Sequence, residues 1–198
     1  MNEATPRRYR QNVRARRAAQ TAERILDAFV ALFWERPGAA FSLDDVAARA
    51  GVTVQTVIRR FGGRDGLMSA AVEREHARVA RERDPAEIAD PRDAVRQLVD
   101  HYERDGDGAF RLLATELHEP ALAPLAERGR TLHRDWCAAA FGASLAGLDA
   151  ATRTRRMAQV VAVCDVYTWK LLRRDGGLTR ADTETALLEL LTPLLEDR

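Results

Sequence analysis

Hydrophobic positions repeat at helical spacing along most of the chain, and no segment alternates with the period of a strand. The first apolar stripe begins near Thr21 and is predicted to end at Pro37-Gly38. Its apolar residues fall at i, i+4, i+7 and i+8: Ile25, Phe29, Leu32 and Phe33. Further stripes of the same period follow almost to the last residue. The pattern predicts an all-α protein with about nine helices.

Two short helices joined by a tight turn are predicted for residues 42–61. Ser42 can cap the first helix, and two aspartates follow in the first turn, where the helix dipole favours negative charge. Gly51 gives the turn the left-handed backbone that it needs, and Thr53 can cap the second helix. This is the pattern of a helix-turn-helix motif.

The second of these helices has two different faces. Val57 and Phe61 are four residues apart and share the face predicted to pack inward, whereas Gln55 and Arg59 share the opposite face. A polar outer face of this kind suits contacts with base edges and phosphates in a major groove. Taken alone, the motif leaves open an ordinary helical hairpin in an enzyme.

Charge is distributed unevenly, although the formal net charge is only +1. Residues 1–62 contain 11 Arg and 6 acidic residues, and the remainder contains 20 basic and 24 acidic residues. Such a distribution is expected when a nucleic-acid-binding domain is joined to a domain that avoids the polyanion. Residues 1–20 are predicted to form a basic flexible arm that enters a minor groove or contacts phosphates; a solvated tail is the alternative.

The remaining pattern predicts a helix-turn-helix domain at 21–68 and a helical ligand-binding and dimerisation domain at 69–198. The boundary is expected inside a helix whose second half is dense in charge. The same pattern predicts three details of the larger domain. One helix should end at Asp105-Gly106-Asp107-Gly108, another of some 25 residues should run from Asp149 to Asp175, and Pro193 should kink or end the last one.

The chain offers little chemistry for catalysis. Cys137 and Cys164 stand in apolar helical patterns without His or Asp at ligand spacing, so they are interpreted as reduced core residues, with redox sensing as the alternative. No nucleophile motif or phosphate-binding loop is present, and the acidic turn at 105–108 lacks the downstream ligands of a calcium loop. We therefore expect neither an enzyme nor a metal or cofactor site.

The apolar runs and the N-terminus bear on location and assembly. No apolar run is long enough to cross a bilayer, and no secretory signal is recognised, which predicts a cytoplasmic protein without a membrane partner. The last two long helices carry more apolar residues than one face requires, which predicts a homodimer through a two-fold four-helix interface. The interface candidates are Met157, Val161, Thr168, Leu172, Leu187, Leu190, Leu191 and Leu194.

The order of these parts resembles the TetR family of bacterial transcriptional regulators. A basic arm is followed by ILDAFVALFWERPG and then by FSLDDVAARAGVTVQTVIRRFGGRDGLMSAAV, and the specific resemblance covers about residues 21–72. Residue type and spacing agree at Ala28, Leu32, Phe33, Ser42, Val46, Ala47, Ala50, Gly51, Val52, Thr56, Phe61 and Leu67. The resemblance implies a homodimer with a DNA-binding head and a ligand-binding body.

The resemblance also implies roles for single residues. Ile58 stands where most members carry a Tyr that contacts the DNA backbone, so that contact is in doubt. Arg60 stands where members often have His, and Arg64 where they often have Lys; both keep a donor for a phosphate. The full set of candidate DNA contacts is Arg14, Arg16, Arg17, Ser42, Thr53, Val54, Gln55, Thr56, Ile58, Arg59, Arg60 and Arg64.

The function implied is repression of a double-stranded DNA operator, relieved by a small apolar or amphipathic effector that binds in the body. Candidate pocket residues, each of which could instead be simple core, are Leu98, Tyr102, Phe110, Leu113, Leu117, His133, Trp136, Cys137, Cys164 and Tyr167. One alternative is a helical small-molecule binding protein or enzyme without a DNA role. A second is a family member that activates transcription or acts without a ligand.

Overall fold

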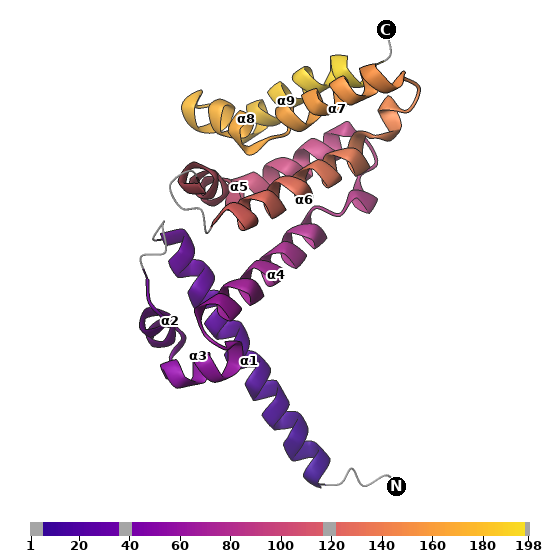
Figure 1. The fold of residues 1–198 in the computed structure, drawn as a ribbon. Coiled ribbons are helices and arrows are strands. Elements are labelled where there is room, and N and C mark those ends of the chain that lie inside the picture. Colours follow the sequence, from indigo (N-terminus) through magenta and orange to yellow (C-terminus); the bar gives the residue numbers. More distant parts are fainter. Residues whose placement is uncertain (1–5, 36–40, 117–121, 197–198) are drawn as a thin grey trace, which may run out of the picture. The chain divides into compact units, whose positions relative to one another are not determined.

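The computed structural model describes residues 6–35, 41–116 and 122–196, with side chains from residue 13 onward. Within these ranges the chain forms nine α-helices and no strand, which confirms the all-α prediction (Figure 1). None of the described helices combines the length and the apolar character needed to cross a membrane. The predicted end of the first helix at Pro37-Gly38 lies outside the described residues.

The chain divides into two compact units, Met1–Glu75 and His76–Arg198, here called the head and the body. The division falls within α4 (Arg64–Glu82), so this helix contributes residues to both.

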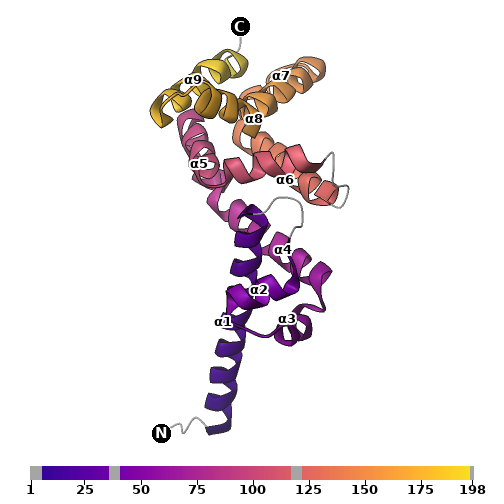
Figure 2. The ribbon, with the colours of Figure 1, turned by 90° about the vertical axis from the view of Figure 1, so that its left-hand side faces the viewer.

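The head consists of α1 (Pro6–Glu35), α2 (Leu43–Ala50), α3 (Val54–Phe61) and the first part of α4. Helix α2 packs against both α1 and α3 (Figure 2). The buried core is apolar and draws on all four helices and on the residue before the capping serine: Ile25, Leu26, Ala28, Phe29, Leu32, Phe41, Val46, Ala47, Ala50, Val57, Leu67 and Ala71. Short helices such as α2 and α3 are marginal alone, so this shared core holds them in place.

Helix α1 begins at Pro6, well before the start predicted near Thr21. Thr21 lies inside the helix, where its hydroxyl donates to the carbonyl of Arg17 at 2.9 Å. The basic segment reads ARRAAQ at residues 15–20, and Ala, Arg and Gln all have high helix propensity. Arg14, Arg16 and Arg17 are therefore exposed helical positions, and the prediction of an arm without regular structure is wrong for this segment.

The body follows α4 with a 3-10 turn at Pro85–Glu87 and then α5 (Pro91–Glu116), α6 (Ala123–Phe141), a 3-10 turn at Ala143–Leu145, α7 (Ala150–Val163), α8 (Val166–Lys170), a π-helical segment at Leu171–Asp175, and α9 (Arg180–Leu195). Helix α5 packs against α6, α8 and α9, while α7 packs against α6 and α9 (Figure 1). The core lies between these helices and includes both cysteines.

Helix α5 runs without a break through residues 105–108, so the predicted helix end there is wrong. Gly106 is buried against the indole of Trp169 on α8. A Cβ at Gly106 would lie 2.6 Å from the Cζ3 atom of that ring. This glycine therefore allows two helices to approach closely and does not stop the helix.

The long helix predicted from Asp149 to Asp175 is also interrupted. Helix α7 ends at Val163, the carbonyl of Cys164 accepts a hydrogen bond from the Tyr102 hydroxyl at 2.9 Å, and Asp165 caps α8. The tyrosine and the new cap satisfy backbone groups that the break leaves without helical partners. Since the tyrosine comes from α5, this compensation cannot be seen in the local sequence.

Pro193 lies in the last turn of α9, which ends at Leu195. Arg156 donates from Nη1 to the carbonyls of Leu194 and Glu196, at 2.8 Å in each case. These bonds satisfy carbonyl groups at the end of the helix. The prediction that the helix ends near Pro193 agrees with this.

Candidate DNA-binding surface

The start of α2 is fixed by a reciprocal capping box. The Ser42 hydroxyl accepts from the backbone N–H of Asp45 at 3.2 Å, and the Ser42 N–H donates to the Asp45 carboxylate at 2.7 Å. At the other end, Gly51 has a φ of 64° and its N–H donates to the Ala48 carbonyl at 3.2 Å. The Ser42 cap and the left-handed Gly51 were predicted from the sequence and are confirmed, whereas the bond from the Ser42 N–H to the Asp45 carboxylate was not predicted.

The turn leads directly into α3, whose start and inward face are held by specific contacts. The Thr53 hydroxyl accepts from the N–H of Thr56 at 3.2 Å, and the two threonine hydroxyls are 2.9 Å apart. Val57 is fully buried in the head core, and Phe61 is half-buried beside it. With one face held inward by these contacts, the opposite face of α3 is directed to solvent.

The outer face of α3 carries Gln55, Ile58 and Arg59, all of them exposed. Among the residues that the structure describes, the side chains of Gln55 and Arg59 form no hydrogen bond or ion pair. The exposed fraction of Ile58 is 40%, which is high for a large aliphatic side chain. An amide, a guanidinium and an apolar group are thus available together on one short helix.

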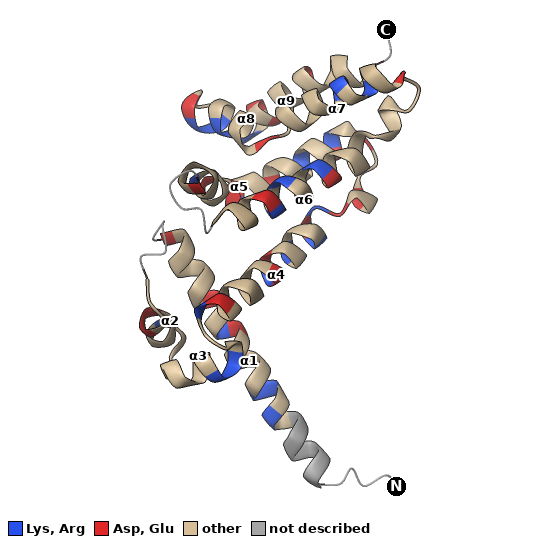
Figure 3. Ribbon diagram, in the orientation of Figure 1, with Lys and Arg blue, Asp and Glu red and all other residues tan. Residues whose placement is uncertain are grey.

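Two further arginines near α3 are tied to backbone carbonyls of the head. Arg60 donates to the carbonyl of Ala18 on α1. Arg64 donates to the carbonyl of Phe41, and its guanidinium carbon lies 4.8 Å from the centre of the Phe41 ring. Figure 3 shows basic residues gathered at the end of α3 and on α1. The sequence gives no sign of these carbonyl contacts, because they join residues far apart in the chain.

The other candidate contacts differ in exposure. Ser42 and Thr53 are exposed at the starts of α2 and α3, whereas Val54 and Thr56 are half-buried. The sequence reasoning also missed Arg49, whose guanidinium forms two hydrogen bonds of 2.5 and 2.7 Å with Glu35 and so joins α2 to α1. This pair orients the motif and leaves the outer face of α3 unobstructed.

The predicted pocket residues do not share one environment. Six of them are buried in the core of the body: Leu98, Tyr102, His133, Trp136, Cys137 and Cys164. Phe110 and Leu113 are half-buried, and Leu117 lies outside the described residues. Tyr167 has an exposed fraction of 46%, with its ring edge-on to that of Phe110, so it lies at the surface of the body.

The interface candidates also divide by burial. Leu187 and Leu191 have exposed fractions of 1% and 0% within their own chain, so a second subunit has nothing left to cover there, and these two predictions are wrong. The remaining candidates are half-buried or exposed: Met157, Val161, Thr168, Leu172, Leu190 and Leu194. Leu171 was not predicted, yet its exposed fraction is 61%.

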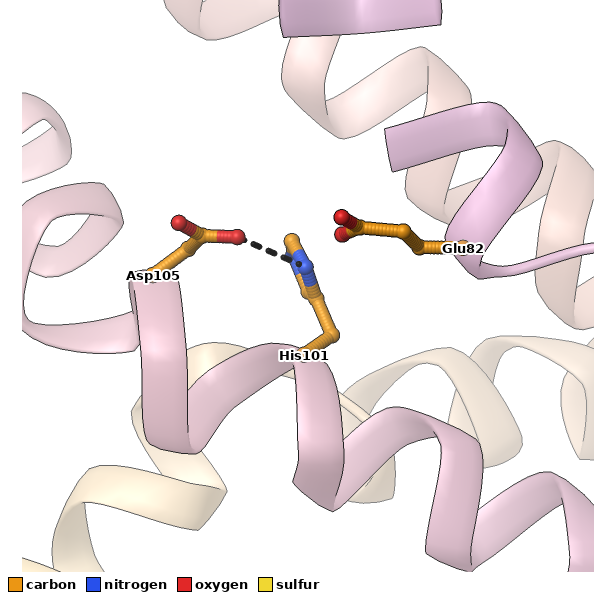
Figure 4. Close-up of side chains that lie close together, drawn as sticks. All are labelled: Glu82, His101 and Asp105. Carbon is orange, nitrogen blue, oxygen red and sulfur yellow. Dashed lines mark ion pairs between the residues drawn. The ribbon is translucent and has the colours of Figure 1, made fainter. Parts of the chain in front are cut away.

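Three titratable side chains in the body lie close enough together to be considered as metal ligands. Single ligand atoms of Glu82, His101 and Asp105 lie within 4.8 Å of one another (Figure 4). However, Arg78 donates to both carboxylates, at 2.8 Å to Glu82 and 3.1 Å to Asp105, and Arg104 pairs with Glu82 at 2.6 Å. Burial lowers the pKa of His101. Two guanidinium groups already balance the two carboxylates, so a cation would have to displace Arg78.

A capped two-helix unit with a left-handed glycine turn and an exposed polar face on its second helix defines the class of helix-turn-helix DNA-binding proteins. Residues 25–71 match the profile of the family described as "Bacterial regulatory proteins, tetR family". The chain is also 31% identical over 188 residues to an uncharacterized HTH-type transcriptional regulator found in two strains of Mycobacterium tuberculosis. That match covers 91% of this chain and 88% of the relative. The chain belongs to the TetR family of bacterial transcriptional regulators.

Solved structures support the same fold. A protein of Rhodococcus sp. assigned to this family has a TM-score of 0.60 and 20% identity, with 89% of this chain and 99% of that chain covered. A family member from Streptomyces coelicolor A3 has a TM-score of 0.57 and 24% identity, with 86% and 97% covered. The family consists of DNA-binding transcription factors and not of enzymes, which removes the enzyme alternative.

Proposed function

We propose that the protein is a homodimeric repressor that leaves its operator when a small apolar or amphipathic molecule binds in the body. The observation that carries the DNA-binding part is the outer face of α3, where Gln55 and Arg59 are exposed and have no partners among the described residues. Because Val57 is buried, rotation of the helix away from this presentation would expose core. The outer face of α3 is therefore available to bind a partner other than the chain itself.

The chemistry of this face fits direct reading of base pairs. An amide such as Gln55 can bond to both polar groups on the major-groove edge of adenine, and a guanidinium such as Arg59 can do the same with guanine. Ile58 can contact a thymine methyl group. We assign phosphate contacts to the hydroxyls and arginines around the helix: Arg14, Arg16, Arg17, Ser42, Thr53, Arg60 and Arg64. Val54 and Thr56 are assigned to the groove wall.

Dimerisation is supported by large apolar side chains left exposed near the end of the body. Tyr167 on α8, Leu171 in the π-helical segment and Leu190 on α9 have exposed fractions of 46%, 61% and 46%. The π-helical segment contacts both α8 and α9, and apolar groups exposed on neighbouring elements mark interaction surfaces. A two-fold axis lets one such surface cover its own copy, and the two α3 helices then read half-sites about one turn of DNA apart.

Release by a ligand requires that the ligand prefer one arrangement of the dimer. A molecule that binds both arrangements with equal affinity would not shift the equilibrium between them, however tightly it bound. The buried residues of the body, among them Leu98 and Trp136, supply the apolar surroundings for such a molecule. Since operator DNA lies in the bacterial cytoplasm, we place the protein there as well.

The DNA-reading proposal can be tested by selecting bound sequences from a random double-stranded library and then measuring the affinity of variants. Gln55→Ala and Arg59→Ala should each weaken binding to the selected site by about 1–3 kcal/mol and relax preference at one base pair. Arg153→Ala, an exposed arginine on α7 of the body, is the matched control. If both outer-face variants kept the affinity and the sequence preference of the unmodified protein, α3 would not be the helix that reads the base pairs.

The dimer proposal has a separate test in sedimentation. Leu171→Glu and Leu190→Glu should convert the dimer to a monomer, because a carboxylate in the centre of an apolar interface loses its hydration. Ala139→Glu, an exposed position on α6, should leave the dimer intact. A dimer that persists in both leucine variants would place the interface elsewhere.

A further inference from the structure

Arg83, the residue after α4, is a buried cation. Its exposed fraction is 4%, and among the described residues no carboxylate forms an ion pair with it. The guanidinium carbon lies 4.2 Å from the centre of a Trp136 ring, and Nη2 is 3.4 Å from the Nδ1 atom of His133. The Nε atom is buried and has no hydrogen-bond partner in the part of the chain that the structure describes. A buried charge in this state is costly, so an anion is expected beside it.

His133 connects this cation to a sulfur atom. Because Arg83 can only donate, the Nδ1 atom of His133 accepts, and the imidazole proton must reside on Nε2. That nitrogen lies 3.1 Å from the carbonyl oxygen of Val161 and 3.7 Å from the Sγ atom of Cys137. The imidazole N–H and the guanidinium therefore both raise the positive potential at Cys137.

The acidic groups around Arg83 differ in how readily they ionise. The Tyr102 hydroxyl donates to the Cys164 carbonyl at 2.9 Å, and burial raises its pKa, so it stays neutral. The neighbouring Cys164 thiol lowers the pKa of Cys137, and His133 and Arg83 lower it further. Cys137 and burial in turn raise the pKa of Cys164. Cys137 is thus the group that can supply the missing anion, with Cys164 held as its protonated neighbour.

We propose that Cys137 and Cys164 form a peroxide-reactive pair, in which Cys137 is the nucleophile, Cys164 is the resolving thiol, and oxidation joins α6 to the end of α7 by a disulfide. Both thiols are buried in the core of the body, and the Cys137 sulfur lies 3.7 Å from the Nε2 atom of His133, whose Nδ1 atom accepts from Arg83. The site therefore provides both partners of the bond and an electrostatic field that favours attack. The site lies wholly in the body and is independent of the proposed DNA contacts.

The reaction balances with hydrogen peroxide as the only co-reactant. The Cys137 thiolate attacks one peroxide oxygen, the O–O bond breaks, and hydroxide leaves and takes up a proton as water, which gives a sulfenic acid. The Cys164 sulfur then attacks the Cys137 sulfur, the S–O bond breaks, and the departing hydroxide takes the Cys164 proton as a second water. Two thiols are oxidised by two electrons, and the peroxide is reduced to two waters.

The test uses the full reduced chain, hydrogen peroxide as the probe, and no DNA. Since the chain contains only 2 cysteines, an intramolecular disulfide can join only this pair. We expect the loss of both titratable thiols, a mass lower by two hydrogens, and one cross-linked peptide pair in a chain that remains a single polypeptide on a non-reducing gel. Thiols that stay reduced, oxidation that stops at separate sulfur acids, or disulfides between chains would each overturn the proposal.

The pH profile of the unmodified protein tests the charge arrangement without any substitution. The charged and titratable groups that face the Cys137 sulfur are Arg83, His133, Cys164 and Tyr102. Because the pKa of Cys137 is lowered, its peroxide rate should stay constant from about pH 9 down to neutrality. An ordinary thiol with a pKa of about 8.5 would lose about tenfold per pH unit below that value, and this result would refute the thiolate assignment.

Substitution of Arg83 and, as a control, of a nearby exposed arginine tests the role of the buried charge. Arg83→Met keeps the length of the side chain and removes a charge that lowers the pKa of Cys137, so the pH below which the peroxide rate falls should shift upward, while the rate at high pH stays the same. Arg81→Met, an exposed neighbour in the last turn of α4, should react like the unmodified chain. If Arg83→Met does not fold, Cys164→Ser decides the mechanism: Cys137 should then stop at a sulfenic acid that dimedone traps, and an unreactive Cys137 would contradict the proposal.

Discussion

Gly106, in the middle of α5, lies against the indole of Trp169, so Gly106→Ala should destabilise the body. An added Cβ would lie 2.6 Å from Cζ3, 2.8 Å from Cη2 and 3.0 Å from Cε3 of that ring. The indole has no room to retreat, because Trp169 is fully buried and its Nε1 donates to Glu103 at 3.3 Å. The guanidinium of Arg174 also lies 4.6 Å from the ring centre.

The size of the effect follows from two opposing contributions. Overpacking of a well-packed core by one methyl group costs about 1–3 kcal/mol. Alanine in place of glycine in a helix interior contributes about 1 kcal/mol in the stabilising direction. We therefore expect a net loss of up to about 2 kcal/mol of unfolding free energy for Gly106→Ala.

Gly129 in α6 is the matched control, since it is also inside a helix but a Cβ there would meet nothing within 4 Å. Gly129→Ala should stabilise by about 1 kcal/mol, and the two variants should differ by about 1–3 kcal/mol. Urea unfolding followed by circular dichroism and by tryptophan fluorescence measures the difference. If Gly106→Ala stabilised the protein as much as Gly129→Ala, the close packing of α5 on α8 would be refuted.

Three further outcomes follow from single contacts. Ser42→Ala removes the capping box with Asp45, and should cost the head about 1 kcal/mol and increase hydrogen exchange of the α2 amides but not of the body. Gly51→Ala meets no atom but must keep a φ of 64°, so strain alone should cost about 1–2 kcal/mol in urea unfolding. Arg174 lowers the pKa of the Asp107 carboxyl through two hydrogen bonds. The pair therefore stabilises the fold fully above the unfolded-state pKa of about 3.9, and this stabilisation is lost as the pH falls through the lower folded-state pKa. Arg174→Gln should flatten the acid limb of stability against pH, and an unchanged limb would contradict the pair.

The helix-turn-helix could be predicted closely because its determinants are local. Ser42 and Thr53 cap helices through groups three residues away, and Gly51 adopts the left-handed backbone that other residues avoid. The burial of Val57 and the exposure of Gln55 and Arg59 follow from the period of the helix. Each of these features depends on a few neighbouring residues, so a sequence pattern contains the necessary information.

The failed predictions depend on partners that are distant in the chain. Gly106 suggests a helix end until Trp169 is placed against it, and the long helix after Asp149 looks continuous until Tyr102 binds the carbonyl of Cys164. Leu187 and Leu191 carry the same apolar pattern as interface residues, yet the body core covers them. Hydrophobic period identifies a face that must be covered, but it does not identify the partner that covers it.

The reactive pair shows the same division between local pattern and long-range packing. That Cys137 and Cys164 occupy apolar helical positions is a property of the chain order, and it predicts inert core thiols equally well. The contact of Cys137 with His133, the bond from Arg83 to the same imidazole and the burial of both thiols in one core arise only when residues from α6, the end of α7 and the end of α4 pack together. Helical period and caps act over a few residues, whereas the charge that decides the reactivity of a thiol reaches it through space.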